Sequence, residues 1–305
     1  MTDTALESLL ERLLDGAPLT QADRDALFET RDLLTLGMAA DELRRRRHGS
    51  RITFVRVATI EAAAALSGDV RWSGSPGELC LAGSAEPIDA AISAVRHTVA
   101  ASGGIPVTGF SLADLEAAAA ASGEALVNVL RRLREAGLAA IASAPLDAVR
   151  DPDAGVTAAE EAGLPIARLT IERLGTGDRE RLLMTAAALV ESHPGLRVFA
   201  PLPRRLAAAT PSTGYEDVQL VALARLLVPV DHIQVDWALY GPKLAQVALA
   251  FGADDVDAVS PLDEVPEGRR RAPLEEIRRN IVAASAEPVE RDALFAVRSA
   301  PGSAA

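Results

Sequence analysis

The sequence predicts an α/β fold, a TIM-barrel-like (βα)8 barrel that follows an N-terminal helical extension. From residue 52 onward, short apolar runs alternate with longer amphipathic stretches, and Gly or Pro precedes several of the runs. Eight such runs favour a closed barrel over the structural alternative, an open doubly wound sheet. No G-x-G-x-x-G follows the first run, which weakens a dinucleotide-binding interpretation.

The expected strands cover residues 52–57, 78–81, 105–108, 138–141, 166–171, 197–201, 232–236 and 255–258. Amphipathic helices are expected between them at 88–101, 112–121, 125–135, 158–162, 178–192, 217–227 and 243–251. In a barrel of this kind, the loops after the C-terminal ends of the strands carry the chemistry.

The first fifty residues show helical periodicity. Thr20 and Asp23 have the spacing of a capping box at the start of the second helix. We therefore expect a helical extension at 1–50, a barrel domain at 51–298 and a flexible tail at 299–305.

Composition limits the classes of partner. The chain has 305 residues, 49% of them hydrophobic, and a net charge of −12, which argues against a nucleic-acid partner. The basic run from Arg44 to Arg47 is interpreted as a solvated helix end, with a phosphate or partner site as the alternative.

The sequence also predicts a cytoplasmic location. It contains no apolar run of about 18 residues, the N-terminus is acidic rather than signal-like, and there is a single cysteine. We therefore expect no membrane association.

Sequence motifs near the C-terminal end are the most distinctive. They are Thr213-Gly214-Tyr215-Glu216-Asp217, Ile233-Gln234 with Trp237, Gly241-Pro242-Lys243-Leu244-Ala245-Gln246 and Phe251-Gly252-Ala253-Asp254-Asp255. Together with segments at 27–49 and 131–138, they resemble the radical-SAM subfamily of aminofutalosine synthase, cyclic dehypoxanthine futalosine synthase and deazaflavin synthase. The resemblance implies a barrel and a link to menaquinone biosynthesis.

The chain departs from this subfamily at the residues that bind its cofactors. The subfamily carries C-x-x-x-C-x-x-C after its first strand, where this chain has Ala58-Thr59-Ile60-Glu61. No iron–sulfur cluster and no other metal is therefore expected. Gly83 and Ser84 stand where the subfamily has a Gly-Gly turn that contacts S-adenosylmethionine, so binding of that molecule is doubtful. The lone Cys80 is interpreted as a small buried side chain, with a reactive thiolate as the alternative.

Eight residues are candidates for binding a small molecule. Two are Gly83 and Ser84, and Glu172 stands in place of the family's Tyr-Gly-His segment. Arg204 follows the sixth strand and could bind a carboxylate or phosphate, with solvent exposure as the favoured alternative. The others, Asp236, Trp237, Asp254 and Asp255, are placed near the barrel mouth by strand position or by the resemblance.

Several of these candidates have open alternatives. Trp237 could stack on a flat ligand or plug the barrel. The carboxylates Asp254 and Asp255, with Asp257, could bind a metal, but surface acids or a helix cap are favoured. The four histidines, His48, His97, His193 and His232, lack zinc-type spacing, so structural or surface roles are expected.

Two functional hypotheses follow. The first is a cluster-less homologue of the futalosine-pathway enzymes, either a non-catalytic partner of an intact radical-SAM paralogue in a hetero-oligomer or a small-molecule binder in menaquinone biosynthesis. The second is an enzyme with non-radical acid/base chemistry, using Asp236, Asp254, Asp255 or Glu172. It predicts a carboxylate of raised pKa in a deep pocket, whereas the first predicts a filled mouth or an apolar surface patch.

Overall fold

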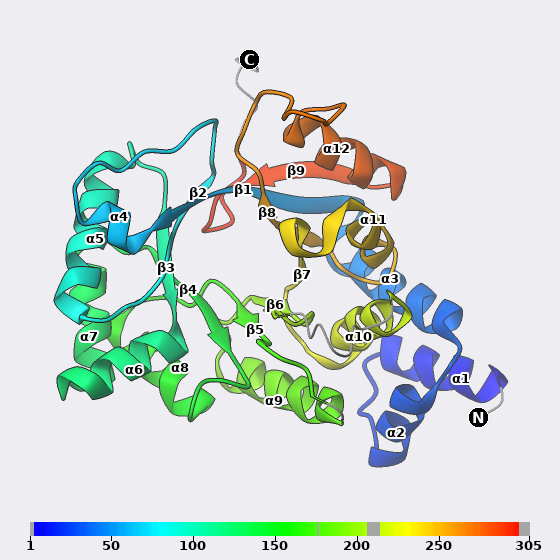
Figure 1. The fold of residues 1–305 in the computed structure, drawn as a ribbon. Helices are drawn as coiled ribbons and strands as arrows, with labels where there is room; N and C mark the ends of the chain where they lie inside the picture. Colours follow the sequence, from blue (N-terminus) through cyan, green and yellow to red (C-terminus); the bar gives the residue numbers. More distant parts are fainter. Residues whose placement is uncertain (1–2, 176, 206–213, 299–305) are drawn as a thin grey trace.

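A closed, TIM-barrel-like parallel barrel forms the centre of the molecule (Figure 1). The structure is a computed structural model that describes residues 3–175, 177–205 and 214–298. Each strand from β1 to β7 pairs in parallel with the next, and β8 pairs in parallel with β1 to close the ring. The closed barrel, rather than the open sheet, is therefore confirmed. The tail predicted at 299–305 lies outside the described residues.

The strands of the described segments run in sequence order around the barrel. They are β1 (Arg51–Glu61), β2 (Glu78–Ala82), β3 (Val107–Ser111), β4 (Ala140–Pro145), β5 (Leu169–Thr170), β6 (Val198–Ala200), β7 (His232–Asp236) and β8 (Asp255–Val259). A further strand, β9 (Glu287–Arg291), lies outside the ring and pairs with β1. The fifth and sixth strands are shorter than predicted. In the fifth, Ile166 contributes only an isolated bridge to Ile141.

Helices surround the strands, in the order α1 to α12. They are α1 (Asp3–Leu14), α2 (Gln21–Glu29), α3 (Leu33–His48), α4 (Ala62–Ala65), α5 (Ile88–Ala101), α6 (Leu112–Ser122), α7 (Leu126–Glu135), α8 (Pro152–Ala162), α9 (Asp178–Ser192), α10 (Gly214–Leu227), α11 (Trp237–Leu249) and α12 (Pro273–Ala283). Within α11, Gly241 has non-helical dihedral angles and Pro242 follows it, so the helix is kinked there.

Strand β9 is a feature that the sequence did not predict. It pairs in parallel with the first half of β1, from Arg51 to Val55, while β2 pairs with the second half, from Val57 to Glu61 (Figure 1). The length of β1, 11 residues, allows both pairings. The chain after the barrel thus returns to the N-terminal end of β1.

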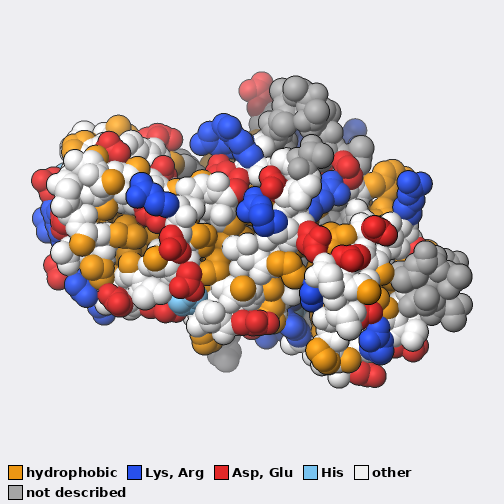
Figure 2. Space-filling model, turned by 90° about the horizontal axis from the view of Figure 1, so that it is seen from below, with side chains coloured by type: hydrophobic (Ala, Val, Ile, Leu, Met, Phe, Trp, Pro, Cys, Tyr) orange, Lys and Arg blue, Asp and Glu red, His pale blue; other side chains and the backbone are white. Residues whose placement is uncertain are grey.

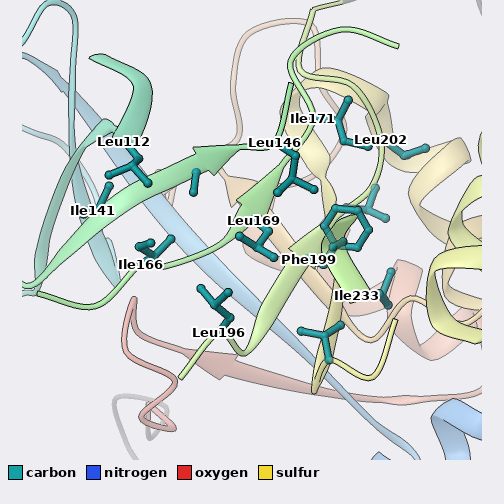
Figure 3. Packing of buried hydrophobic residues seen from close by; sticks show 14 of the residues in the cluster. Leu112, Ile141, Leu146, Ile166, Leu169, Ile171, Leu196, Phe199, Leu202 and Ile233 are labelled. Atoms are coloured by element: carbon teal, nitrogen blue, oxygen red, sulfur yellow. The ribbon is translucent and has the colours of Figure 1, made fainter. Parts of the chain in front are cut away.

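The barrel strands also contribute to a large apolar core outside the ring. Leu169, Phe199 and Ile233 pair in register on β5, β6 and β7 and are fully buried (Figure 3). Burial of each such side chain contributes about 1.5–3 kcal/mol. Because side chains alternate along a strand, Arg168 and Thr170 face away from this core and into the barrel.

The helical extension is held to the barrel by polar contacts. The predicted capping box of Thr20 and Asp23 is present at α2. Interpreting the basic run as a solvated helix end is wrong for Arg44, which is 2% exposed and binds Asp41. Arg47 donates to the carbonyl oxygen of Val230 at 2.5 Å, which fastens the end of α3 beside β7.

Figure 2 shows that charged side chains of both signs are interspersed on this face, with hydrophobic side chains visible between them. Among the described helices, none is both long enough and apolar enough to cross a membrane.

Candidate functional site

A chain of polar contacts crosses the barrel interior. Thr108 on β3 donates to Oε1 of Glu78 at 2.5 Å, and Nη2 of Arg168 lies 3.1 Å from the same oxygen. Nη1 of Arg168 pairs with the carboxylate of Asp257 on β8. Glu78 and Thr108 are almost fully buried, so these contacts replace water as hydrogen-bond partners.

Arg204 and Asp236 continue this chain toward the C-terminal end of the strands. Nη1 of Arg204 lies 2.5 Å from Oδ2 of Asp236, and Nη2 lies 3.7 Å from Oδ2 of Asp257. Oδ1 of Asp236 caps α11 by accepting from the N–H of Leu239 at 2.9 Å. The N–H of Arg204 donates to the carbonyl of Ile171 at 2.8 Å, which fixes the segment after β6 against the end of β5.

Several donors in this interior lack hydrogen-bond partners within the described part of the chain. They are Nε and Nη2 of Arg204, Nε of Arg168 and the hydroxyl of Thr170, all buried. Nε and Nη2 form one edge of the Arg204 guanidinium and point two parallel N–H groups the same way, the geometry that a carboxylate or phosphate accepts. A buried donor without a partner costs about 1–3 kcal/mol, so this edge is suited to a ligand that supplies acceptors.

The charges of this interior cluster favour an anionic ligand only at the Nε–Nη2 edge of Arg204. Three carboxylates (Glu78, Asp236 and Asp257) face two guanidiniums (Arg168 and Arg204), which leaves one excess negative charge. Burial lowers the pKa of Arg204, an effect that Asp236 opposes. An anion would therefore gain from the Arg204 edge and be weakened by the neighbouring carboxylates.

Two further candidates lie near Arg204. Glu172 pairs with Arg205 at 2.9 Å, and its N–H donates to Asp147 at 2.7 Å. Trp237 is 8% exposed and belongs to the apolar core, which supports the packing role over a platform for a flat ligand.

Gly83 and Ser84 lie on another part of the rim, at the end of β2. Gly83 has φ of 101°, and a Cβ atom there would lie 3.4 Å from Oε2 of Glu61 on β1. Oγ of Ser84 accepts from the N–H of Glu86 at 3.0 Å. In the described part of the structure, no contact joins these two residues to Arg204 or Asp236.

The placement of Asp254 and Asp255 near the barrel mouth is wrong. Strand β8 begins at Asp255 and ends at Val259, so both carboxylates lie at the N-terminal end of the barrel. Asp254 pairs with Arg225, and Asp255 binds Arg291 at 2.6 Å. These partners, Arg225 on α10 and Arg291 on β9, hold the two carboxylates in place. The sequence did not predict β9.

The pKa directions of these two carboxylates follow from their partners. Burial acts to raise the pKa of Asp254, but the charge of Arg225 and the hydrogen bond from His232 outweigh it, so the pKa is lowered. Burial is likewise outweighed at Asp255 by Arg291, which lowers its pKa to about 2. Neither has the raised pKa that a general acid near neutral pH requires.

The residues do not fit an iron–sulfur cluster. Three thiolates are needed, and the whole sequence has one cysteine, Cys80 on β2. Burial, together with the nearby charge of Glu78, raises the pKa of this thiol to about 11. The thiol therefore stays protonated at neutral pH. Strand β1 leads directly into α4, where the subfamily has its cluster-binding loop.

Sequence reasoning missed Arg168, Glu78 and Thr170, which complete the interior cluster. The available signal was the period of two along the strand, since Arg168, Thr170 and Glu172 alternate with apolar residues. Charged and polar residues on the inner face of a predicted barrel strand would have identified these positions.

Comparison with known proteins agrees with the fold. No family model matches the chain. It is 26% identical to aminodeoxyfutalosine synthase of Thermus thermophilus, covering 96% of each chain. It is 27% identical to the 5-amino-6-(D-ribitylamino)uracil–L-tyrosine 4-hydroxyphenyl transferase of Methanosphaerula palustris, covering 86% of this chain and 88% of that one. The chain is a homologue of radical-SAM enzymes. Its single cysteine fits a member of this group that lacks the cluster.

Solved structures of radical-SAM enzymes share the fold of this homologue. Methylornithine synthase (PylB) matches with a TM-score of 0.63 at 16% identity, over 92% of this chain and 97% of that one. The FeFe-hydrogenase maturase HydG from Carboxydothermus hydrogenoformans matches with a TM-score of 0.63 at 15% identity, over 94% and 79%. At these identities the match concerns the fold alone.

Proposed function

We propose that this radical-SAM homologue binds a small molecule inside the barrel without radical chemistry. The observation that supports the proposal is the Nε–Nη2 edge of Arg204, which is buried and has no hydrogen-bond partner among the described residues. The ligand would present acceptor oxygens to this edge, and a carboxylate matches two parallel donors best. Arg168 and Thr170 would supply further donors.

The pathway part of the proposal is menaquinone biosynthesis. It is supported by similarity to the Thermus thermophilus aminodeoxyfutalosine synthase. A hetero-oligomer with an intact radical-SAM paralogue is a second proposal, supported by the exposed side chains of Leu34 and Met38, four residues apart on α3. Stoichiometric co-purification of such a paralogue from native cells would support it, and recovery of the protein without it would count against it.

The acid/base alternative is less well supported. Of its four carboxylates, Asp254 and Asp255 lie at the N-terminal end of the barrel with lowered pKa values, and Asp236 is paired with Arg204. Glu172 is paired with Arg205.

Thermal unfolding in the presence of inorganic phosphate or acetate tests the binding proposal. Binding to the folded state raises the melting temperature with ligand concentration. We expect both probes to stabilise the wild type more than matched chloride, and Arg204→Gln to abolish the effect. Arg205→Gln is the control, because the Arg205 side chain is exposed and, among the described residues, forms an ion pair with Glu172 alone. Equal stabilisation of both variants, or none of the wild type, would overturn the proposal.

A further inference from the structure

Two imidazoles and one carboxylate meet at the N-terminal end of the barrel, opposite the Arg204 cluster. His48 ends α3, His232 begins β7 and Asp254 precedes β8. One ligand-type atom from each residue can be chosen so that all three lie within 4.8 Å of one another. The three residues are distant in sequence, so only the fold brings them together.

The carboxylate of Asp254 divides its partners between its two oxygens. Oδ1 accepts from the guanidinium of Arg225 and from the N–H of Ile233 at 2.9 Å. Oδ2 faces the imidazoles, with Nδ1 of His232 at 2.5 Å and Nε2 of His48 at 3.4 Å. Arg225 thus orients the carboxylate without occupying the oxygen that faces the histidines, the role of an outer partner in metal sites.

The imidazole of His232 is held in place by stacking. Its ring lies between those of His48, at a centroid distance of 4.8 Å, and Phe295, at 4.4 Å. His232 and Asp254 are buried, while the side chain of His48 is 20% exposed. Solvent therefore reaches the group from the His48 side, where an ion could enter and keep a water ligand.

We propose that His48, His232 and Asp254 form a binding site for a divalent transition-metal ion. Two imidazole nitrogens and a carboxylate oxygen with an open fourth position are a ligand set that Zn²⁺ and Co²⁺ accept, whereas Ca²⁺ and Mg²⁺ need mainly oxygen ligands. Two ligands of a tetrahedral zinc ion lie roughly 3.3 Å apart, given bonds of about 2.0–2.1 Å. The 3.4 Å between Nε2 of His48 and Oδ2 of Asp254 matches this spacing. The His232 contact has to lengthen, and Nε2 of His48 has to give up its 2.8 Å contact with the carbonyl oxygen of Asp231. The nearby charge of Arg225 opposes a cation, so the imidazoles must supply most of the affinity.

Cobalt titration of the full, tag-free chain after chelator treatment tests this site. We expect one Co²⁺ per chain with a visible absorption band, displaced by Zn²⁺. His48→Ala should weaken binding by at least about tenfold. It leaves the Arg225–Asp254 pair in place. His97→Ala is the matched control, because His97 lies on α5 and contacts the carbonyl of Ala65 at 2.9 Å.

Absence of stoichiometric Co²⁺ binding would overturn the proposal, and so would equal binding by the two variants. If His48→Ala does not fold, X-ray absorption of the zinc-loaded wild type decides instead. Scattering from two imidazoles supports the site, and a shell of oxygen alone overturns it. Neither readout depends on the ligand of the Arg204 cluster.

Discussion

Arg204 donates from Nη1 to Asp236 at 2.5 Å, while the Nε–Nη2 edge of the same guanidinium has no hydrogen-bond partner in the described structure. Asp236 thus orients the guanidinium and compensates its charge at the same time. An acceptor-bearing ligand would have to bind in the presence of that carboxylate.

Asp236→Asn should strengthen binding of an anion at Arg204. The substitution removes a negative charge next to the guanidinium, while asparagine can still cap α11. We expect the thermal stabilisation by inorganic phosphate to occur at a concentration several-fold lower than in the wild type. Weaker or unchanged binding of phosphate in Asp236→Asn, with α11 intact by circular dichroism, would contradict an anion site at Arg204.

Cys80 should react slowly with thiol reagents in the folded protein. A pKa of about 11, against 9.0 for an ordinary cysteine, gives about one-hundredth of the usual thiolate fraction at pH 7. We expect alkylation by iodoacetamide to be about 100-fold slower than in urea-unfolded protein, with a rate that keeps rising up to pH 10. A rate that levels off by about pH 10 would show a normal thiol, and a plateau at lower pH would show an activated one.

Asp255 should stabilise the fold above about pH 4 and lose this effect as the pH falls. Its pKa is lowered from 3.8 to about 2, so the folded state favours the ionised form by about 2 kcal/mol. This stability is complete above the unfolded pKa and is lost as the pH falls through the folded pKa near 2.

Asp255→Asn leaves Arg291 buried without its charged partner, at an expected cost of about 3–5 kcal/mol at pH 7. Urea unfolding at pH 7 and pH 3 measures both effects, with exposed Glu267→Gln as the control. The free energies of unfolding of Asp255→Asn and Glu267→Gln should differ less at pH 3 than at pH 7. An equal difference at the two pH values would refute the link between the ionisation of Asp255 and stability.

Gly37→Ala should destabilise the packing of α3. An added Cβ atom would lie 2.7 Å from Cε1 of Phe251, closer than such atoms approach in folded proteins. Overpacking costs about 1–3 kcal/mol and exceeds the gain of up to about 1 kcal/mol in helix propensity. Gly214→Ala on α10 meets no atom within 4 Å and should be neutral or stabilising. The urea midpoint of Gly37→Ala should therefore fall, while that of Gly214→Ala should rise or stay unchanged.

The strands of the barrel could be predicted because each is an apolar run with a helix after it. The segment from Glu287 to Arg291 could not, since Pro288 and Val289 are its only apolar residues. Its pairing with β1 joins segments that are far apart in the sequence, so no local sequence pattern predicts it.

The candidate site could be predicted only in part. Arg204 and Asp236 follow strand ends, so their meeting at the mouth followed from barrel geometry. The resemblance predicts Asp254 and Asp255 at the mouth, whereas Asp255 begins β8 at the opposite end of the barrel. The interior positions of Arg168 and Glu78 depend on which face of a strand points into the barrel. His48, His232 and Asp254 are distant in sequence and meet only in the folded barrel.

Native mass spectrometry of the protein purified from its own cells tests the central claim most directly. We expect the wild type and Arg205→Gln to carry the same bound small molecule, with acceptor oxygens in its composition, and Arg204→Gln to have lost it. A small molecule retained equally by Arg204→Gln, or an unliganded wild type with an iron–sulfur cluster in its place, would contradict the account.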